Sequence, residues 1–191
     1  MTLLTGTLTR LAAPNVDTDL DVWTAWARNS EFLRLLDADP AKPWSRQQAR
    51  KDLEELPKDN QFPFVVRALA DDRLVGFVGL FGVQWTHGDA WVGIGIGDEN
   101  DWGKGYGTDA MRVVLHYAFT ELNLHRVSLM VFGYNPRAIR SYEKAGFVVE
   151  GRTRQTLNRD GQYWDELYMG ILREEWEKKI QDSTPNLNFE S

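Results

Sequence analysis

The feature that most constrains this chain is an alternating glycine strand that runs into a glycine-rich turn and then a helix. It spans residues 91–108 and reads W-V-G-I-G-I-G-D-E-N-D-W-G-K-G-Y-G-T. An apolar pattern with helical spacing, Thr108–Leu122, begins at once after it. The first turn of a helix has backbone N–H groups without intrahelical partners. The stretch therefore predicts an anion site at a helix N-terminus.

Glycine occupies every second position of the strand before this turn. Gly93, Gly95 and Gly97 leave one face of the strand bare, while branched side chains fill the other. Glycines inside a strand often mark a bulge or a ligand lying close to the backbone. One interpretation is a strand whose backbone pairs with an extended, amide-bearing ligand. The alternative is that the glycines only let the sheet curve.

The glycine turn by itself fits several nucleotide-like ligands. Gly105–Ala110 matches the dinucleotide pattern G-x-G-x-x-A, but a loop separates it from its strand. The acidic residue expected after the next strand is absent, because residues 133–135 read G-Y-N. A P-loop fails as well, since Lys104 is followed by glycine. What remains is a loop of N–H groups from Gly103 to Thr108 facing a diphosphate, and an amide-bearing arm ending at a diphosphate describes coenzyme A.

The rest of the chain alternates between strand and helix patterns. Strands are expected at residues 5–11, 62–70, 74–82, 90–97, 126–132, 147–157 and 163–172. Helices are expected through Leu20–Ala27 after acidic N-cap candidates at Asp17–Asp21, then at 31–36, 47–56 with Ser45 as N-cap, 108–122, 136–145 and 173–180. We therefore predict one mixed α/β domain at residues 1–180, followed by a polar segment, 181–191, that is expected to fray.

Composition excludes several classes of function. The net charge of −6 argues against a nucleic-acid partner, and a chain without cysteine has neither disulfides nor a cysteine nucleophile. Three scattered histidines give no metal-ligand spacing, so no metal site is expected. No run is long enough to span a membrane and the N-terminus lacks a signal-peptide core, so a cytoplasmic protein is expected.

Two motifs in this order resemble one known family. W-G-K-G-Y-G-T-D-A, followed after one strand by N-P-R-A-I-R-S-Y-E-K-A-G-F, is similar to the GCN5-related N-acetyltransferases (GNAT). The segment E-G-R-T-R-Q-T-L-N-R-D-G-Q-Y-W-D-E-L-Y-M-G-I-L resembles their ribosomal-protein and spermidine acetyltransferase branch. The resemblance covers Leu8–Trp176. It implies an α/β fold with a twisted, mostly antiparallel sheet flanked by helices, acetyl-CoA as co-substrate, an amine acceptor attacked directly, and a homodimer.

The resemblance also assigns roles to individual residues. It implies that the backbone of Ile94 and Ile96 meets the pantetheine arm and acetyl carbonyl, that Asn135 hydrogen-bonds the pantetheine, and that Arg137 reaches the adenosine end. The residues expected to bind acetyl-CoA are Ile94, Gly95, Ile96, Trp102, Gly103, Lys104, Gly105, Tyr106, Gly107, Thr108, Asn135, Arg137 and Tyr142. Tyr142 is the expected catalytic residue, because a phenol with a pKa of ~10 can protonate a departing thiolate.

Several alternatives stay open at this level. Trp91 stands where many relatives carry a glutamate base, which leaves Asp89, Glu31, His87, Glu150 or bound water. The acceptor is a protein N-terminal amine, a polyamine or a small-molecule amine. The N-terminal helices, with their two tryptophans, either wall the acceptor pocket or serve as scaffold. The competing classes are a CoA-binding module without catalysis and an NAD-dependent oxidoreductase, against which the missing acidic residue argues.

Overall fold

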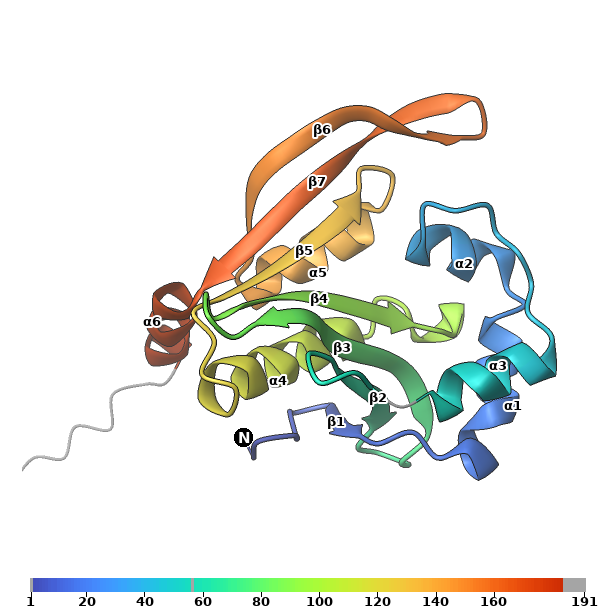
Figure 1. Cartoon of the computed structure of the whole chain (residues 1–191), viewed down its shortest axis with the longest axis horizontal. Helices are drawn as coiled ribbons and strands as arrows, with labels where there is room; N and C mark the ends of the chain where they lie inside the picture. Colours follow the sequence, from blue (N-terminus) through green and yellow to red (C-terminus); the bar gives the residue numbers. More distant parts are fainter. Residues whose placement is uncertain (1, 56, 184–191) are drawn as a thin grey trace, which may run out of the picture.

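Seven strands form one twisted sheet in the order β1-β2-β3-β4-β5-β7-β6, with helices on both faces (Figure 1). A computed structural model describes residues 2–55 and 57–183. The strands are β1 (Thr9–Ala12), β2 (Phe62–Ala68), β3 (Leu74–Gln84), β4 (Asp89–Ile96), β5 (Arg126–Phe132), β6 (Val148–Arg159) and β7 (Gln162–Leu172). The helices are α1 (Val16–Trp26), α2 (Ser30–Leu36), α3 (Arg46–Glu54), the 3-10 helix η1 (Glu99–Asp101), α4 (Tyr106–Thr120), α5 (Pro136–Ala145) and α6 (Arg173–Ser183).

The pairing of β4 with β5 is the one parallel contact among the paired strands of the described chain. This parallel pairing joins only Asp89–Trp91 of β4 to Arg126–Ser128 of β5. Beyond Trp91 the two strands diverge toward the side of the molecule where α2 lies (Figure 1). The predicted mixed, mostly antiparallel sheet is confirmed, and the divergence leaves one edge of β4 without a strand partner.

One face of the sheet carries the main hydrophobic core. Val92 of β4 and Leu129 of β5 point to this face and cluster with α4, whose Met111, Val114 and Phe119 are fully buried. This matches the apolar stripe expected of the helix. Burial of these side chains supplies the main force that holds α4, and hence its N-terminus, against the diverging strands.

The glycines of β4 clear the opposite face for protein side chains. A Cβ at Gly97 would lie 1.9 Å from the ring of Trp26, and one at Gly95 would lie 2.7 Å from Phe77 and 3.2 Å from Phe32. Aromatic rings from α1, α2 and β3 therefore occupy the bare face. The free edge of β4 is therefore the part of the strand with which an extended ligand can pair.

Local signals explain most of the element boundaries. Ser45 forms the predicted cap of α3, with a reciprocal bond to Gln48, and Gly146 ends α5 with a φ of 117°. The cap of α1 is Asn15 rather than an acid of Asp17–Asp21, because the Asn15 side chain accepts the Asp17 N–H. β1 begins at Thr9 instead of residue 5, since backbone N–H groups just before it bond to α4. The predicted helix end at residue 56 and the polar tail from 184 onward lie outside the described residues.

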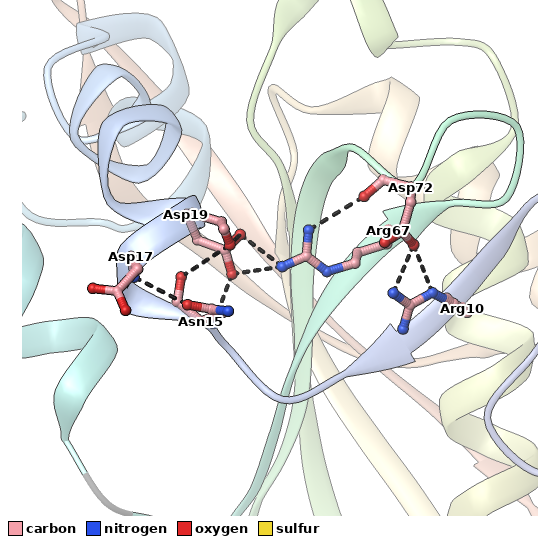
Figure 2. Close-up of polar contacts among 7 residues, drawn as sticks. Arg10, Asn15, Asp17, Asp19, Arg67 and Asp72 are labelled. Carbon is pink, nitrogen blue, oxygen red and sulfur yellow. Dashed lines mark hydrogen bonds and ion pairs between the residues drawn. The ribbon is translucent and has the colours of Figure 1, made fainter.

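A buried ion pair fixes α1 against the sheet (Figure 2). Asp19 of α1 is almost completely buried and accepts bonds of 2.6 and 2.8 Å from Arg67 of β2, and another from the Asn15 N–H. Arg67 also donates to the carbonyl of Asp72, whose carboxylate pairs with Arg10 of β1. This network places α1, and with it α2, over the glycine face of β4.

No helix among residues 2–55 and 57–183 combines the length and apolar character needed to cross a membrane.

Candidate active site

A cavity of about 270 Å³ opens where β4 and β5 diverge. Its lining combines β4, the glycine turn, α4, α5 and α2, and consists of Phe32, Leu35, Leu36, Ile94, Gly95, Ile96, Asp101, Trp102, Gly103, Gly105, Tyr106, Gly107, Thr108, Asn135, Arg137, Ala138, Arg140, Ser141, Tyr142 and Lys144. Every residue expected to bind the co-substrate lies in this lining except Lys104. The structure therefore brings together segments that are widely separated in the sequence.

The N-terminus of α4 opens into the cavity with its N–H groups available. The residue before the helix is Gly105 with a φ of 92°, a left-handed conformation that favours glycine, and no side chain caps the helix. Gly103, in the same turn, is also left-handed, with a φ of 76°. The uncapped N–H groups and the helix dipole attract negative charge. The hydroxyls of Thr108 and Ser141 lie 2.8 Å apart and join this turn to α5.

The free edge of β4 forms a second wall. The Gly97 N–H donates to the Val75 carbonyl of β3, so the backbone groups of Ile96 and Ile94 point the other way, toward the cavity. Trp102 donates its indole N–H to the Ile96 carbonyl at 2.7 Å. The N–H of Ile96 and both backbone groups of Ile94 are left facing the cavity. An extended ligand with amide groups can pair with them as a strand would.

Cationic side chains of α5 line the cavity along one side of the helix. Arg137, Arg140 and Lys144 are spaced by three and four residues, so they share one helical face. The guanidinium of Arg137 lies 3.6 Å from the centre of the Trp102 ring. Burial lowers the pKa of Arg137, while Glu31 and Glu99 raise it. Lys104, in contrast, lies outside the lining with its Nζ 3.6 Å from Asp101.

A buried carboxylate holds the glycine turn in place. Asp109, in the first turn of α4, accepts five hydrogen bonds of 2.7–3.0 Å from Thr7, Leu8 and Thr9. Burial raises the pKa of Asp109, whereas the bonds from Thr7, Leu8 and Thr9 together lower it by more. The net pKa of Asp109 therefore lies below its ordinary value. Arg73 anchors the other end of the turn through bonds of 2.5 and 2.6 Å to Asp101. The anion site is therefore rigid before any ligand arrives.

Tyr142 of α5 is both part of the core and part of the cavity wall. Its ring packs edge-on against Phe147 at 6.2 Å. Its hydroxyl makes no hydrogen bond to any of the described residues. Burial raises its pKa to about 12, against a smaller opposing effect of Arg137. The phenol therefore keeps its proton at neutral pH and has a free donor in the cavity.

The side chain of Asn135 serves the fold as well as the cavity. It is buried, and its Oδ1 accepts the Ala138 N–H at 3.1 Å, which caps α5. This bond fixes the start of the helix that carries Arg137 and Tyr142.

The candidate bases lie in less suitable places. Glu150 is held by Arg126 in a two-bond ion pair, and Asp89 lies with Trp91 in a second cavity at the closed end of the diverging strands. His87 is in an exposed turn, and Glu31 is exposed on the first turn of α2. Among the described residues, no carboxylate in the main cavity replaces the expected glutamate, since Asp101 is paired with Arg73.

Sequence reasoning left open whether the N-terminal helices wall a pocket or serve as scaffold, and it did not single out the residues of α2. Phe32, Leu35 and Leu36 line the cavity, whereas the tryptophans of α1 do not: Trp26 packs on Gly97, and Trp23 donates to Asp52. Apolar residues in a seven-residue helix give no signal that separates a pocket wall from a core. Arg140 and Lys144 were also missed, and their shared helical face with Arg137 could have indicated them.

A site of this construction holds an anionic group at a helix N-terminus and an amide-bearing arm along a strand edge. The residues present fit a coenzyme A thioester, because the cavity combines uncapped N–H groups, cationic side chains and an unpaired strand edge. The fold and the site together define a CoA-dependent acyltransferase.

Comparison with known proteins gives the family. Residues 10–148 match the family described as Acetyltransferase (GNAT) domain, so the chain belongs to the GNAT acetyltransferases, as the motifs indicated. It is 38% identical over 120 residues to the probable N-acetyltransferase YjcK of Bacillus subtilis, covering 62% of this chain and 66% of that protein. It is 36% identical to the spermidine N(1)-acetyltransferase of Vibrio cholerae, covering 65% and 74%. The structure of spermidine N-acetyltransferase from Vibrio cholerae with CoA and spermine is similar, with a TM-score of 0.74, 27% identity, and coverage of 88% and 98%.

The chain is therefore an N-acetyltransferase that uses acetyl-CoA as co-substrate. The interpretation as an NAD-dependent oxidoreductase is wrong.

Proposed function

We propose that this enzyme acetylates a primary amine of a small cationic molecule, with polyamines as the preferred acceptors, by direct attack of the amine on acetyl-CoA. The relatives support the substrate class, since their names include spermidine N(1)-acetyltransferases. The observation that carries the reaction is the position of Tyr142, whose unbonded phenol lies in the same cavity as the uncapped N-terminus of α4.

Different residues bind the diphosphate, align the pantetheine arm and donate the proton. The N–H groups at the start of α4, with Arg137 and Arg140, hold the diphosphate end of the co-substrate. The edge of β4 at Ile94 and Ile96 aligns the pantetheine arm. Acetyl-CoA supplies the activated acetyl group as a thioester. Tyr142 holds a proton at its phenol oxygen and gives it to the leaving sulfur, and the phenolate regains a proton when the acetylated nitrogen loses one.

Removal of the proton from the attacking ammonium does not need a carboxylate in the cavity. Trp91 replaces the glutamate of many relatives, and the polar groups at the closed end of the strands are engaged with one another, as in the Arg126–Glu150 pair. We propose that water in the open mouth of the cavity carries this proton to solvent. The consequence is that acceptors react in the fraction that is already neutral.

The test is thiol release from acetyl-CoA across a panel of amines. The panel contains spermidine, a peptide with a free N-terminus and an aminoglycoside. Because the chain has no cysteine, a thiol reagent reports only on CoA. Turnover with spermidine supports the proposal. Turnover with only the peptide or the aminoglycoside would overturn the acceptor class, and CoA binding without any turnover would favour a binding module.

A further inference from the structure

The face of the sheet that carries α1 and α2 is open over β5 and β7. Along β5, Val127, Leu129 and Val131 are buried on the α4 side, so the alternate residues point to the open side. On β7 the alternation is the same, because Leu167 and Met169 are buried on the α4 side. The residues on the open side are Ser128, Met130 and Phe132 of β5, and Trp164, Glu166 and Tyr168 of β7. Asn135, three residues after Phe132, belongs to the lining of the cavity.

Glu166 lies beside the end of β5 that no longer pairs with β4. It lies directly opposite Phe132, the last residue of β5. The Tyr168 hydroxyl donates to its Oε2 at 3.3 Å, and no lysine or arginine of the described residues forms an ion pair with it. The nearby acids differ in this respect, because Asp165 pairs with Arg152 and Glu150 pairs with Arg126. Glu166 is thus a half-buried carboxylate with its charge unmatched.

Aromatic residues neighbour Glu166 on the same face of the sheet, with Phe132 opposite it and Trp164 and Tyr168 two residues to either side. Phe132 stacks on Tyr134 at 5.2 Å, and Tyr134 meets Trp164 edge-on at 5.9 Å. On the other side, Tyr168 meets Trp91 edge-on at 6.5 Å. Ring faces attract ammonium groups, and apolar side chains cover methylene groups. A carboxylate in this setting is complementary to a cation on an alkyl chain.

The surface is bridged at its outer end. The Tyr134 hydroxyl donates to the carbonyl of Arg34 in α2 at 2.8 Å. The guanidinium of Arg159, near the tip of the β6–β7 hairpin, donates to the carbonyls of residues 37–39 at 2.8–3.0 Å. The hairpin tip is therefore fastened to the segment after α2.

We propose that Glu166 binds a second, non-reacting ammonium group of the acceptor and thereby selects diamines and polyamines over monoamines. The inference rests on the proposed function, since it concerns the amine acceptor of the same reaction. The reacting amine reaches the thioester beside Tyr142, and the other amine remains protonated at Glu166. No bond is formed or broken at Glu166, so it is a specificity residue and not a catalytic one.

The experiment compares Glu166→Gln with wild-type enzyme on spermidine and on butylamine. A charge-assisted hydrogen bond contributes enough for the KM of spermidine to rise about tenfold or more, while kcat changes little. The KM of butylamine, which has no second charge, and the KM of acetyl-CoA stay within about twofold. The matched control is Glu177→Gln on α6, which removes one exposed carboxylate far from the cavity and should behave as wild type.

The outcomes separate this inference from the proposed function. If spermidine has the same KM in wild type and Glu166→Gln while thiol is released, Glu166 is not the acceptor site and acetyl transfer stands. Calorimetry of spermidine binding to the CoA-loaded protein gives a readout without turnover. Binding that weakens about tenfold in Glu166→Gln supports the inference even if no thiol is released. If CoA-loaded wild type does not bind spermidine at all, the inference is overturned.

Discussion

Two regions around the cavity are held in place by different kinds of contact. One is the proposed co-substrate wall, formed by the glycine turn, α4 and α5, and the other is the proposed acceptor wall, formed by α2 and the adjoining β6–β7 hairpin. On the co-substrate wall, the buried Asp109 accepts five hydrogen bonds and Arg137 stacks on Trp102. On the acceptor wall, α2 and the β6–β7 hairpin meet through exposed groups, among them the ion pair of Arg34 with Asp160. Buried, saturated bonds resist change, whereas solvated ion pairs contribute little. We therefore expect the proposed co-substrate wall to be rigid, and the proposed acceptor wall to be alterable at small cost in stability.

The largest effect is expected at the residue between the two walls. Tyr142→Phe removes the proton donor while keeping the ring, so kcat should fall by about a hundredfold or more, with the KM of acetyl-CoA nearly unchanged. Steady-state thiol release measures both constants. Tyr117→Phe is the control, because it removes a hydroxyl from another half-buried tyrosine outside the cavity. Wild-type turnover in Tyr142→Phe would rule out the acid role.

The same tyrosine gives a prediction for the pH profile. Burial raises the pKa of Tyr142 to about 12, so its phenol stays protonated through neutral and mildly alkaline pH. We expect kcat to show no decline due to Tyr142 below about pH 11. In the unfolded chain a tyrosine loses its proton near pH 10, so the stability contributed by Tyr142 is complete below ~10 and is lost as pH rises toward ~12. In urea titrations, Tyr142→Phe should lack this loss.

Asp109 tests the rigidity of the co-substrate wall. Asp109→Asn places an amide N–H₂ against some of the five donors, and the unfolding free energy should fall by about 3 kcal/mol. Because the pKa of Asp109 is depressed in the fold, its contribution is complete above the unfolded value of ~3.9 and is lost as pH falls through the folded value. Chemical denaturation at several pH values measures both. Glu121→Gln, an exposed change at the other end of the same helix, should leave stability and pH dependence unaltered.

Sequence patterns predicted the co-substrate wall more completely than the acceptor wall, for a physical reason. A helix N-terminus needs particular residues in one continuous stretch: left-handed Gly103 and Gly105, and Asn135 before Pro136 for the next helix. Such local requirements are visible in the chain. β1 was placed too early because its first N–H groups bond to Asp109, about a hundred residues away, and no local pattern reports that contact.

The acceptor wall depends on register and on packing between distant segments. Whether Glu166 points to the open face is decided by its pairing with Phe132 and by the bulges of β6. The glycines of β4 are equally ambiguous in the sequence. An aromatic ring from α1 and a ligand both require a strand face without side chains, so the glycine pattern does not distinguish them. The charge of Lys104 favours a contact with the diphosphate. Its position in the turn did not predict that its ammonium group lies beside Asp101 instead.

Substitution of Arg137 is expected to have an intermediate effect, limited to the binding of acetyl-CoA. Arg137→Ala removes a charge that lies in the cavity and stacks on Trp102, so the KM of acetyl-CoA should rise by about tenfold. The KM of the amine and kcat should change by less than about threefold. Arg50→Ala, which removes an exposed arginine of α3, is the control. An equal rise in the KM of the amine would mean that Arg137 serves both walls.

The smallest effects are expected where the hairpin meets α2, and they decide how separate the walls are. Asp160→Asn keeps a residue suited to the φ of 55° and removes only a solvated charge, so the KM of spermidine should change at most about twofold. Arg159→Ala removes the bonds to the carbonyls of residues 37–39, which water can replace, and about a threefold rise is expected. Both variants should bind acetyl-CoA as wild type does. If Arg159→Ala instead weakens acetyl-CoA binding and leaves the amine unaffected, the hairpin supports the co-substrate wall, and the division between a rigid and an alterable wall is wrong.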